Sequence, residues 1–286
     1  ERHDPSAREA DNSALAFLKG VIERQAHLIA RWMALGFVHG VMNTDNMTLS
    51  GETIDYGPCA FMEAYDPATV FSSIDQFGRY AYGRQAAIAQ WNLARLAEAL
   101  LPLIDDDEDR AVKRASEAIS GFAHLYHKAY DEAFRKKLGL FTREDDDADL
   151  VASLLLRMQQ KQADFTLTFR AFADAVEPHS DQSLRQVLGD DDVTDALIMR
   201  WRERFLREEV SQAEIQSRIK AANPKRIPRN HRVEEALQAA QTHDDFEPFH
   251  RLMRALSSPY DDESDYAVSE LPAAPEERVR VTFCGT

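Results

Sequence analysis

The chain has 286 residues, 44% of them hydrophobic, and a formal net charge of −15 at pH 7. This length allows one large or two ordinary domains, and the apolar share suits a globular core. The acidic balance argues against nucleic acid and anionic membranes as partners, and there is no run of 18 apolar residues to span a membrane. We therefore expect a cytoplasmic protein. The first residue is Glu, and no charged-then-apolar leader follows it, so we expect a fragment or a processed chain.

Residues 12–35 predict a strong helix. Asn12 or Ser13 can cap its start, apolar residues recur at helical spacing, and Gly36 ends it. Residues 37–60 are short apolar pieces broken by Gly, Asn, Asp and Pro, which predicts a loop with short strands and a hairpin turning near Ser50-Gly51. Residues 61–83 are irregular and rich in aromatic side chains.

From residue 84 the pattern is almost wholly helical, with Trp91 and Trp201 expected in the core. Acidic runs occupy residues 105–109, 143–150 and 189–197. Because acidic side chains favour the positive end of a helix dipole, these runs predict helix starts and solvated turns rather than metal sites.

The end of the chain contains two less regular segments. Residues 222–237 read as a Pro-broken connector followed by a helix, and residues 257–282 as a loose tail.

The most informative stretch is HGVMNTDNMTLSGETIDYG at residues 39–57. Phosphoryl-transfer enzymes hold divalent metal on nucleotide phosphates with carboxylate and amide oxygens, commonly an Asn and then an Asp in an Asp-aromatic-Gly triplet. Asn46 and Asp55 fit that pair, and such oxygen ligands suit Mg²⁺ or Mn²⁺. The plainer interpretations also stand: Asp45-Asn46 as a turn and helix cap, and Asp55-Tyr56-Gly57-Pro58 as a turn.

The stretch resembles small-molecule kinases of the protein-kinase-like fold, which carry His-Gly-Asp, an Asn five residues after that Asp, and a later Ile-Asp. His39, Gly40, Asn46, Ile54 and Asp55 match. The position of the usual catalytic base is Val41, and an Asp stands instead at position 45. His39 is expected to bond backbone in the loop rather than act as acid or base.

Longer strings resemble the SelO (YdiU) family of kinase-like protein adenylyltransferases. They are HGVMNTDNM, TIDYGP, GRYAYGRQ (78–85), QWNLARLAEAL (90–100), NPKRIPRNH (223–231) and the terminal Cys-Gly-Thr. The resemblance runs from about residue 10 to the last residue.

The resemblance implies transfer of AMP from ATP, or UMP from UTP, to Ser, Thr or Tyr hydroxyls of protein substrates. It further implies Asp45 as proton acceptor, Asn46 and Asp55 as ligands of Mg²⁺ or Mn²⁺, and Asp55 also beside ATP. Arg79 and Arg84 follow the metal loop, where they could contact nucleotide or substrate or form surface salt bridges.

The family's nucleotide-clamping lobe has no counterpart before residue 39. No glycine-rich loop or strand-borne Lys-Glu pair precedes that residue, and Lys19 lies within the first expected helix. We expect the isolated chain to have little or no activity without the missing lobe as partner. A conventional kinase and a non-catalytic kinase-like scaffold remain alternatives.

The expected fold class is mainly α, the helical C-terminal lobe of a protein-kinase-like fold with a short β-hairpin at the metal site. The expected regions are residues 1–83, a core with the catalytic and metal loop; 84–256, a helical region; and 257–286, a tail ending in a redox-active Cys.

Composition alone favours two unrelated reduced thiols, Cys59 and Cys284. The resemblance instead implies a terminal Cys that crosses the site and pairs with Cys59. In a reducing cytosol such a bond would be a redox switch that holds the tail over the active-site mouth.

Overall fold

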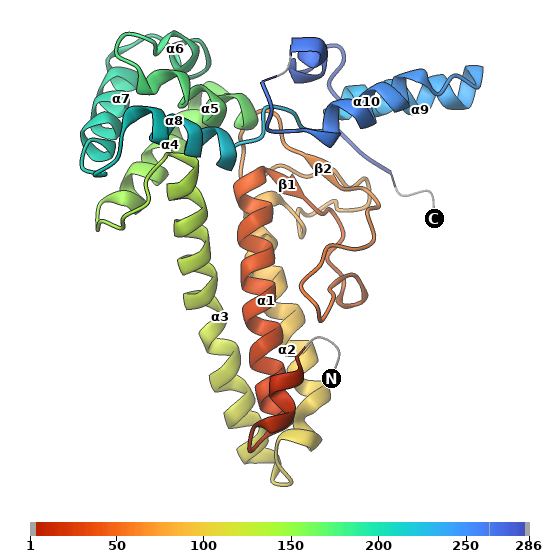
Figure 1. Ribbon diagram of the computed structural model, residues 1–286. Helices are drawn as coiled ribbons and strands as arrows, with labels where there is room; N and C mark the ends of the chain where they lie inside the picture. Colours follow the sequence, from red (N-terminus) through yellow and green to blue (C-terminus); the bar gives the residue numbers. More distant parts are fainter. Residues whose placement is uncertain (1–3, 263, 284–286) are drawn as a thin grey trace.

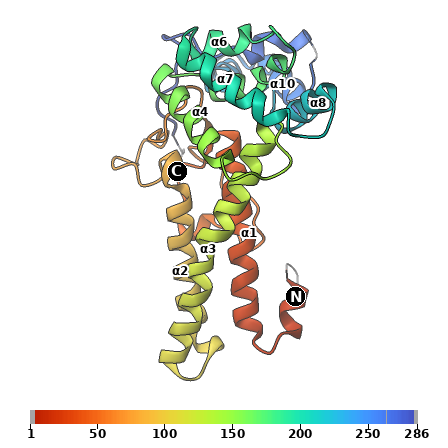
Figure 2. The same ribbon diagram turned by 90° about the vertical axis from the view of Figure 1, so that its left-hand side faces the viewer.

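The computed structural model describes residues 4–262 and 264–283. Three long helices lie side by side and form the stem of the molecule (Figures 1 and 2): α1 (Ser13–Leu35), α2 (Gln85–Ile104) and α3 (Glu108–Lys137). Helix α1 packs against both α2 and α3, so its apolar residues are buried from two sides. The mainly helical class predicted from the sequence is confirmed for the described residues.

Local capping chemistry sets the ends of the stem helices. The Asn12 side chain accepts a hydrogen bond from Leu15 N (2.8 Å), and Gly36 ends α1 in the left-handed conformation at φ 69°. Asp107 caps α3 in the same way through Arg110 N. The helix predicted for residues 12–35 is therefore confirmed, and the acidic run before α3 is a helix start.

A compact group of shorter helices, here called the cap, covers one end of the stem (Figure 2). It consists of α4 (Asp147–Lys161), α5 (Phe165–Ala171), α6 (Gln182–Leu188), α7 (Asp192–Phe205) and α8 (Gln212–Ala222). Acidic residues occupy the first turns of α4 and α7, as predicted. Trp201 is fully buried and donates its indole N–H to Leu138 O (2.9 Å), which confirms it as a core residue.

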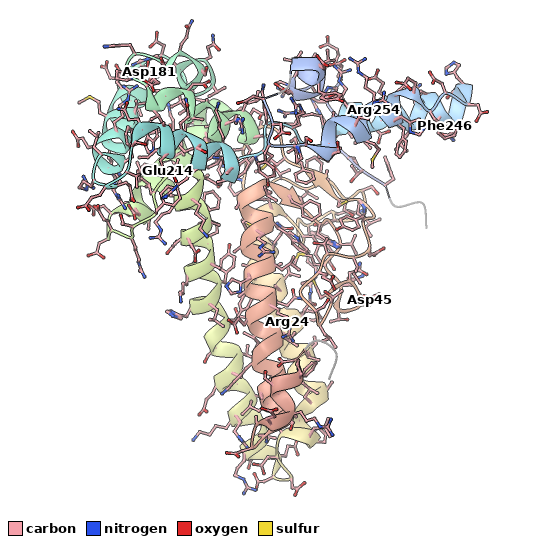
Figure 3. The ribbon with its side chains drawn as sticks, viewed as in Figure 1. Arg24, Asp45, Asp181, Glu214, Phe246 and Arg254 are labelled. Carbon is pink, nitrogen blue, oxygen red and sulfur yellow. The ribbon has the colours of Figure 1, made fainter. Side chains whose placement is uncertain are left out.

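Helices α9 (Asn230–His243) and α10 (Glu247–Ser257) pack on each other and project from the body (Figure 1). Figure 3 labels Phe246, which directly precedes α10, and Arg254 within α10. Among residues 258–262 and 264–283 there is no α-helix, but this part of the chain is not the loose tail that we predicted. The backbone N–H of Ala273 bonds the Glu63 carboxylate, and Thr282 forms a parallel bridge with Ser72. The described part of the tail is therefore fixed to the segment around residues 63–72.

The strands are few and short. β1 (Phe37–Val38) pairs antiparallel with β2 (Ala60–Phe61), and the long loop between them contains the predicted site. Within that loop one antiparallel bridge joins Met47 to Thr53, and Gly51 takes φ 76° at the reversal. The predicted hairpin is thus present in a minimal form. The kinase-like character of the lobe stays a prediction.

Trp91 was expected in the core, and this was wrong. It is 43% exposed on the outer face of α2. The guanidinium of Arg79 lies 4.8 Å from one Trp91 ring centroid and that of Arg95 lies 5.2 Å from it. Helical periodicity placed Trp91 among apolar residues, but cations from two segments cover the ring instead.

Candidate functional site

His39 joins the two ends of the loop. It is fully buried, its Nε2 donates to Ile54 O (2.9 Å), and its Nδ1 accepts from the Val41 N–H (3.4 Å). Burial lowers the pKa of His39 below its ordinary 6.5, although the bond to Ile54 and the charge of Asp55 partly oppose that shift. The ring is therefore neutral at physiological pH, and its bonds to backbone agree with the role predicted for it.

Asp45 and Asn46 lie in a short 3₁₀ turn, Thr44–Asn46. Asn46 is only 9% exposed, and its amide Nδ2 donates to Val41 O (3.0 Å). Among the described residues the carbonyl oxygen of the same amide accepts no hydrogen bond. Asp45 is exposed, at the outer edge of the loop in Figure 3, and within the described residues its carboxylate has no hydrogen bond or ion pair.

Asp55 has an unusual backbone. Its φ of 54° is in the left-handed region, which non-glycine residues adopt at a cost of about 1 kcal/mol. The turn is closed by a hydrogen bond from Gly57 N to Asp55 O (2.8 Å), and the side chain is exposed without an internal partner among the described residues. Strain of this kind is common at functional sites, and here it presents a free carboxylate next to the His39 anchor.

Helix α1 holds the far half of the loop. Arg24 Nε donates to Leu49 O (2.9 Å), Gln25 Nε2 donates to Thr48 O (2.5 Å), and Trp32 Nε1 donates to Thr53 Oγ1 (2.9 Å). Three side chains of one helix therefore fix the reversal at residues 48–53, which lies between Asn46 and Asp55.

Helix α2 holds the first part of the loop, near β1. Gln85 is fully buried: its amide donates to Phe37 O (2.9 Å) and its carbonyl accepts from His39 N (3.1 Å). Asn92 donates to Met42 O (3.0 Å). Sequence reasoning missed both residues. Each is a polar residue on the buried side of a helix otherwise lined with Ile88 and Leu93, and that break in the apolar pattern is the signal that could have found them.

The segment before α2 touches the loop as well. Tyr80 donates its hydroxyl to Asn43 Oδ1 (2.7 Å), two residues before Asp45. Arg79 stacks on Trp91, and Arg84 is exposed. Within the described residues neither arginine forms the surface salt bridge that we considered, so both cations remain able to meet an anionic ligand.

The resulting arrangement suits a cation bound through oxygen. The structure places Asn46 and Asp55 on one loop, whose ends are tied together through Val41 and His39. Among the described residues, neither the Asn46 carbonyl oxygen nor the Asp55 carboxylate has a hydrogen bond. Over the part of the chain that the structure describes, no cluster of three or more His, Cys, Asp or Glu side chains could hold a metal. Two protein ligands are nevertheless sufficient for Mg²⁺, which commonly keeps several waters and substrate phosphates as its other ligands.

Cys59 lies at the end of the same loop and is half-buried. Burial raises the pKa of its thiol, and the nearby charge of Asp55 adds to the rise, so the thiolate is disfavoured. Cys59 is a free thiol. The predicted partner, Cys284, lies outside the described residues. The described tail does reach this place, because Thr282 Oγ1 donates to Pro58 O (2.5 Å).

None of the helices in the described residues combines the length and the apolar character needed to cross a bilayer.

Comparison with known proteins agrees with the motifs. A family model described as "Protein adenylyltransferase SelO" matches residues 1–257. Proteins named "Protein nucleotidyltransferase YdiU" from Rhizobium etli, Methylorubrum populi and Bradyrhizobium diazoefficiens are 52%, 52% and 50% identical to the chain and cover all of it. The chain spans only 57–59% of the length of these three relatives. The match over most of the chain shows that it belongs to the SelO family of nucleotidyltransferases.

Proposed function

We propose that this chain carries the catalytic loop of a protein nucleotidyltransferase, which moves AMP from ATP to Ser, Thr or Tyr hydroxyls of proteins, with UTP as an alternative donor of UMP. The observation that carries the proposal is the contrast within the loop. Its backbone is tied to α1 and α2 by side-chain hydrogen bonds, whereas the carboxylates of Asp45 and Asp55 have no partner in the part of the chain that the structure describes. Held backbone with free carboxylates is a preorganised site.

Asn46 and Asp55 would hold Mg²⁺ or Mn²⁺, and Asp55 would also lie beside the nucleotide. The metal would neutralise phosphate charge when bound. His39 would act through Asp55 rather than on substrate: its bond to Ile54 O sets where the neighbouring carboxylate stands. His39 is therefore a positioning residue in this proposal.

Asp45 would accept the proton of the target hydroxyl. The hydroxyl oxygen forms a bond to the α-phosphorus, the bond from that phosphorus to pyrophosphate breaks, and the proton moves to the Asp45 carboxylate. General base catalysis contributes on the order of 10²–10⁴-fold, so Asp45→Ala should lower the rate by about that factor with nucleotide binding less affected. Single-turnover rates and nucleotide titrations separate the two effects. Equal loss of binding and rate would assign Asp45 to the metal instead.

We propose that the chain works within a longer protein, called the full-length protein below, whose remaining part clamps the nucleotide. The relatives' greater length supports this, as does the position of Lys19 within α1 rather than on a strand. The isolated chain should then have little or no transfer activity.

The experiment that tests the function gives the full-length protein ATP labelled at the α or the γ phosphate. Label from the α position on protein supports AMP transfer. Label from the γ position alone would mean a conventional kinase, which Val41 at the usual base position disfavours, and no label would mean a scaffold. Asp55→Ala serves as the control that should lose the signal.

We further propose that Cys59 pairs with Cys284 as a redox switch over the site. The docking of Thr282 on Pro58, next to Cys59, supports this. Peptide mapping of oxidised protein without reductant should find the linked pair, and wild type should respond to reductant whereas Cys284→Ser should not. A wild-type protein that ignores reductant would refute the switch.

A further inference from the structure

A cavity of about 280 Å³ lies between α1, α2 and the loop that carries Asp45. Its wall is mainly apolar and is formed by side chains of Val21, Met47, Leu49, Ala89, Leu93 and Leu96. The rest of the lining is polar or charged: Gln25, Thr44, Thr48, Asn92 and Arg95. The proposed metal ligands Asn46 and Asp55 do not line it, so the cavity is distinct from the proposed nucleotide site.

Two hydrogen-bond acceptors of the residues that line this cavity have no partner among residues 4–262 and 264–283. Gln25 and Asn92 are 2% and 6% exposed, and the carbonyl oxygens Oε1 and Oδ1 are buried without a hydrogen bond. A buried acceptor left unpaired costs about 1–3 kcal/mol, so a donor that reached either oxygen would bind favourably. Both oxygens have less than 1 Å² exposed, so a ligand would contact them only after the wall moves. The unbranched side chain of Met47, which lines the cavity, is the one best able to make room.

The same two side chains hold the catalytic loop. The amide of Gln25 donates to Thr48 O and that of Asn92 to Met42 O, on either side of Asp45 and Asn46. A ligand that bonds either carbonyl oxygen would therefore contact an amide group whose nitrogen already holds the loop. Binding in the cavity should therefore change the environment of the backbone amides between Met42 and Thr48.

We propose that this cavity binds a small, neutral, planar molecule that carries an N–H or O–H donor. An apolar cavity of roughly 150 Å³ takes benzene, so about 280 Å³ has room for a bicyclic ring. An anion is disfavoured because Arg95, the one charged side chain in the wall, already stacks on Trp91 and pairs with Glu98 (2.6 Å). Binding here does not depend on nucleotidyl transfer.

Indole is the probe for this site, and benzothiophene is its matched control because it has nearly the same shape and no N–H. Each is titrated into the ¹⁵N-labelled chain and followed by amide chemical shifts. Indole should give saturable shifts at Thr44, Met47 and Thr48, and it should bind about threefold to tenfold more tightly than benzothiophene. No saturable shift with millimolar indole would overturn the proposal. Equal affinities for the two molecules would overturn the role of the acceptors.

Two variants locate the binding. Leu96→Trp fills the cavity from α2 and should abolish the indole shifts, whereas Leu103→Trp, at an exposed position of the same helix, should leave them unchanged. If Leu96→Trp does not fold, Leu49→Trp fills the cavity from the loop and serves in its place. Indole binding that survives the filled cavity would place the ligand elsewhere and refute the site.

Discussion

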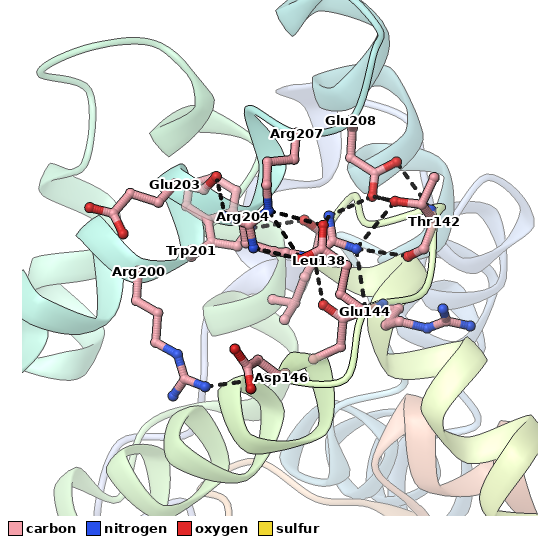
Figure 4. A network of polar contacts seen from close by, with 12 residues as sticks. Leu138, Thr142, Glu144, Asp146, Arg200, Trp201, Glu203, Arg204, Arg207 and Glu208 are labelled. Atoms are coloured by element: carbon pink, nitrogen blue, oxygen red, sulfur yellow. Dashed lines mark hydrogen bonds and ion pairs between the residues drawn. The ribbon is translucent and has the colours of Figure 1, made fainter.

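Arg204 in the cap and Asn46 in the loop are both buried polar residues, but their surroundings differ. All three guanidinium nitrogens of Arg204 are bonded: Nε to Asp147 (2.6 Å), Nη1 to Glu208 (2.9 Å) and Nη2 to the carbonyl of Thr142 (2.8 Å) (Figure 4). Glu208 in turn accepts from the Thr142 backbone N–H and hydroxyl. In the side chain of Asn46, by contrast, only the amide nitrogen has a hydrogen bond among the described residues, and the carboxylate of neighbouring Asp45 has no partner there.

The difference separates polar groups that stabilise the fold from polar groups that are left for a ligand. In a closed network such as that of Arg204, the hydrogen-bonding groups already have protein partners and are not available to a ligand. Removing one member leaves buried polar groups without that partner. Removing an exposed carboxylate that has no protein partner should change the free energy of unfolding little, because water and not the protein stabilised that carboxylate. Stability and function should therefore respond oppositely to mutation in the two regions.

The largest effect on stability is expected at Arg204. Arg204→Met leaves Asp147 and Glu208 as unpaired buried carboxylates, so the free energy of unfolding should fall by about 3–5 kcal/mol. Arg207→Met is the control, because Arg207 is half-exposed and pairs with Glu144 at the surface, where such pairs contribute about 0–1 kcal/mol. Urea unfolding of both variants measures the difference. Equal losses would remove the distinction between closed and surface networks.

Lys137 is a second buried basic residue, at the end of α3 that the cap covers, and it differs from Arg204. It has no ion-pair partner in the described parts of the chain. Its Nζ lies over the rings of Phe165 (5.2 Å) and Phe169 (4.2 Å), and burial lowers its pKa to about 7. Between about pH 7 and the ordinary 10.5, the unfolded chain binds a proton that the folded chain has released. The free energy of unfolding should therefore rise with pH across this window, by at most about 1.4 kcal/mol per pH unit.

Lys137→Met should remove that rise, whereas Lys136→Met, at an exposed position, should keep it. Urea unfolding at several pH values between 7 and 9 measures both. A pH dependence that is the same in Lys137→Met as in wild type would show that another group titrates.

A smaller effect on stability is expected at His39. It belongs to the loop, but both of its ring nitrogens have hydrogen-bond partners, as the guanidinium nitrogens of Arg204 do. His39→Phe keeps a ring beside Trp32 and loses the bonds to Ile54 and Val41, so unfolding should become easier by about 1–3 kcal/mol. Transfer by the full-length protein should fall as well, because the anchor next to Asp55 is gone. His124→Phe, at an exposed position of α3, is the control. Full activity in His39→Phe would contradict the positioning role.

The same residue predicts sensitivity to acid. Below the ordinary pKa of 6.5 an unfolded His39 takes up a proton, while the folded ring, with its lowered pKa, stays neutral. His39 therefore lowers the stability of wild type as pH falls through 6.5, and His39→Phe should lack this contribution.

Local chemistry made parts of the fold predictable. Asn12, Gly36 and Asp107 set helix ends through bonds to neighbours a few residues away, which a sequence displays directly. The loop motif likewise has short spacing, so its residues could be named before the structure was seen.

What the sequence did not reveal depends on partners far away in the chain. Asp147 was expected only to start a helix, but it also pairs with Arg204, 57 residues further on. Asn92 reaches Met42 across 50 residues, and Trp91 is covered by Arg79 from a loop with no regular pattern. Such contacts follow from how helices pack, which the periodicity of one helix does not specify.

The central claim, that the loop is an open site for metal and nucleotide, is tested most directly by Mn²⁺ binding to the full-length protein with ATP, followed by electron paramagnetic resonance. Wild type should bind Mn²⁺, and Asp55→Ala should lose that binding while its free energy of unfolding stays within about 1 kcal/mol of wild type. Retained Mn²⁺ binding in Asp55→Ala, together with a loss of several kcal/mol in stability, would show instead that Asp55 is a structural residue of the fold.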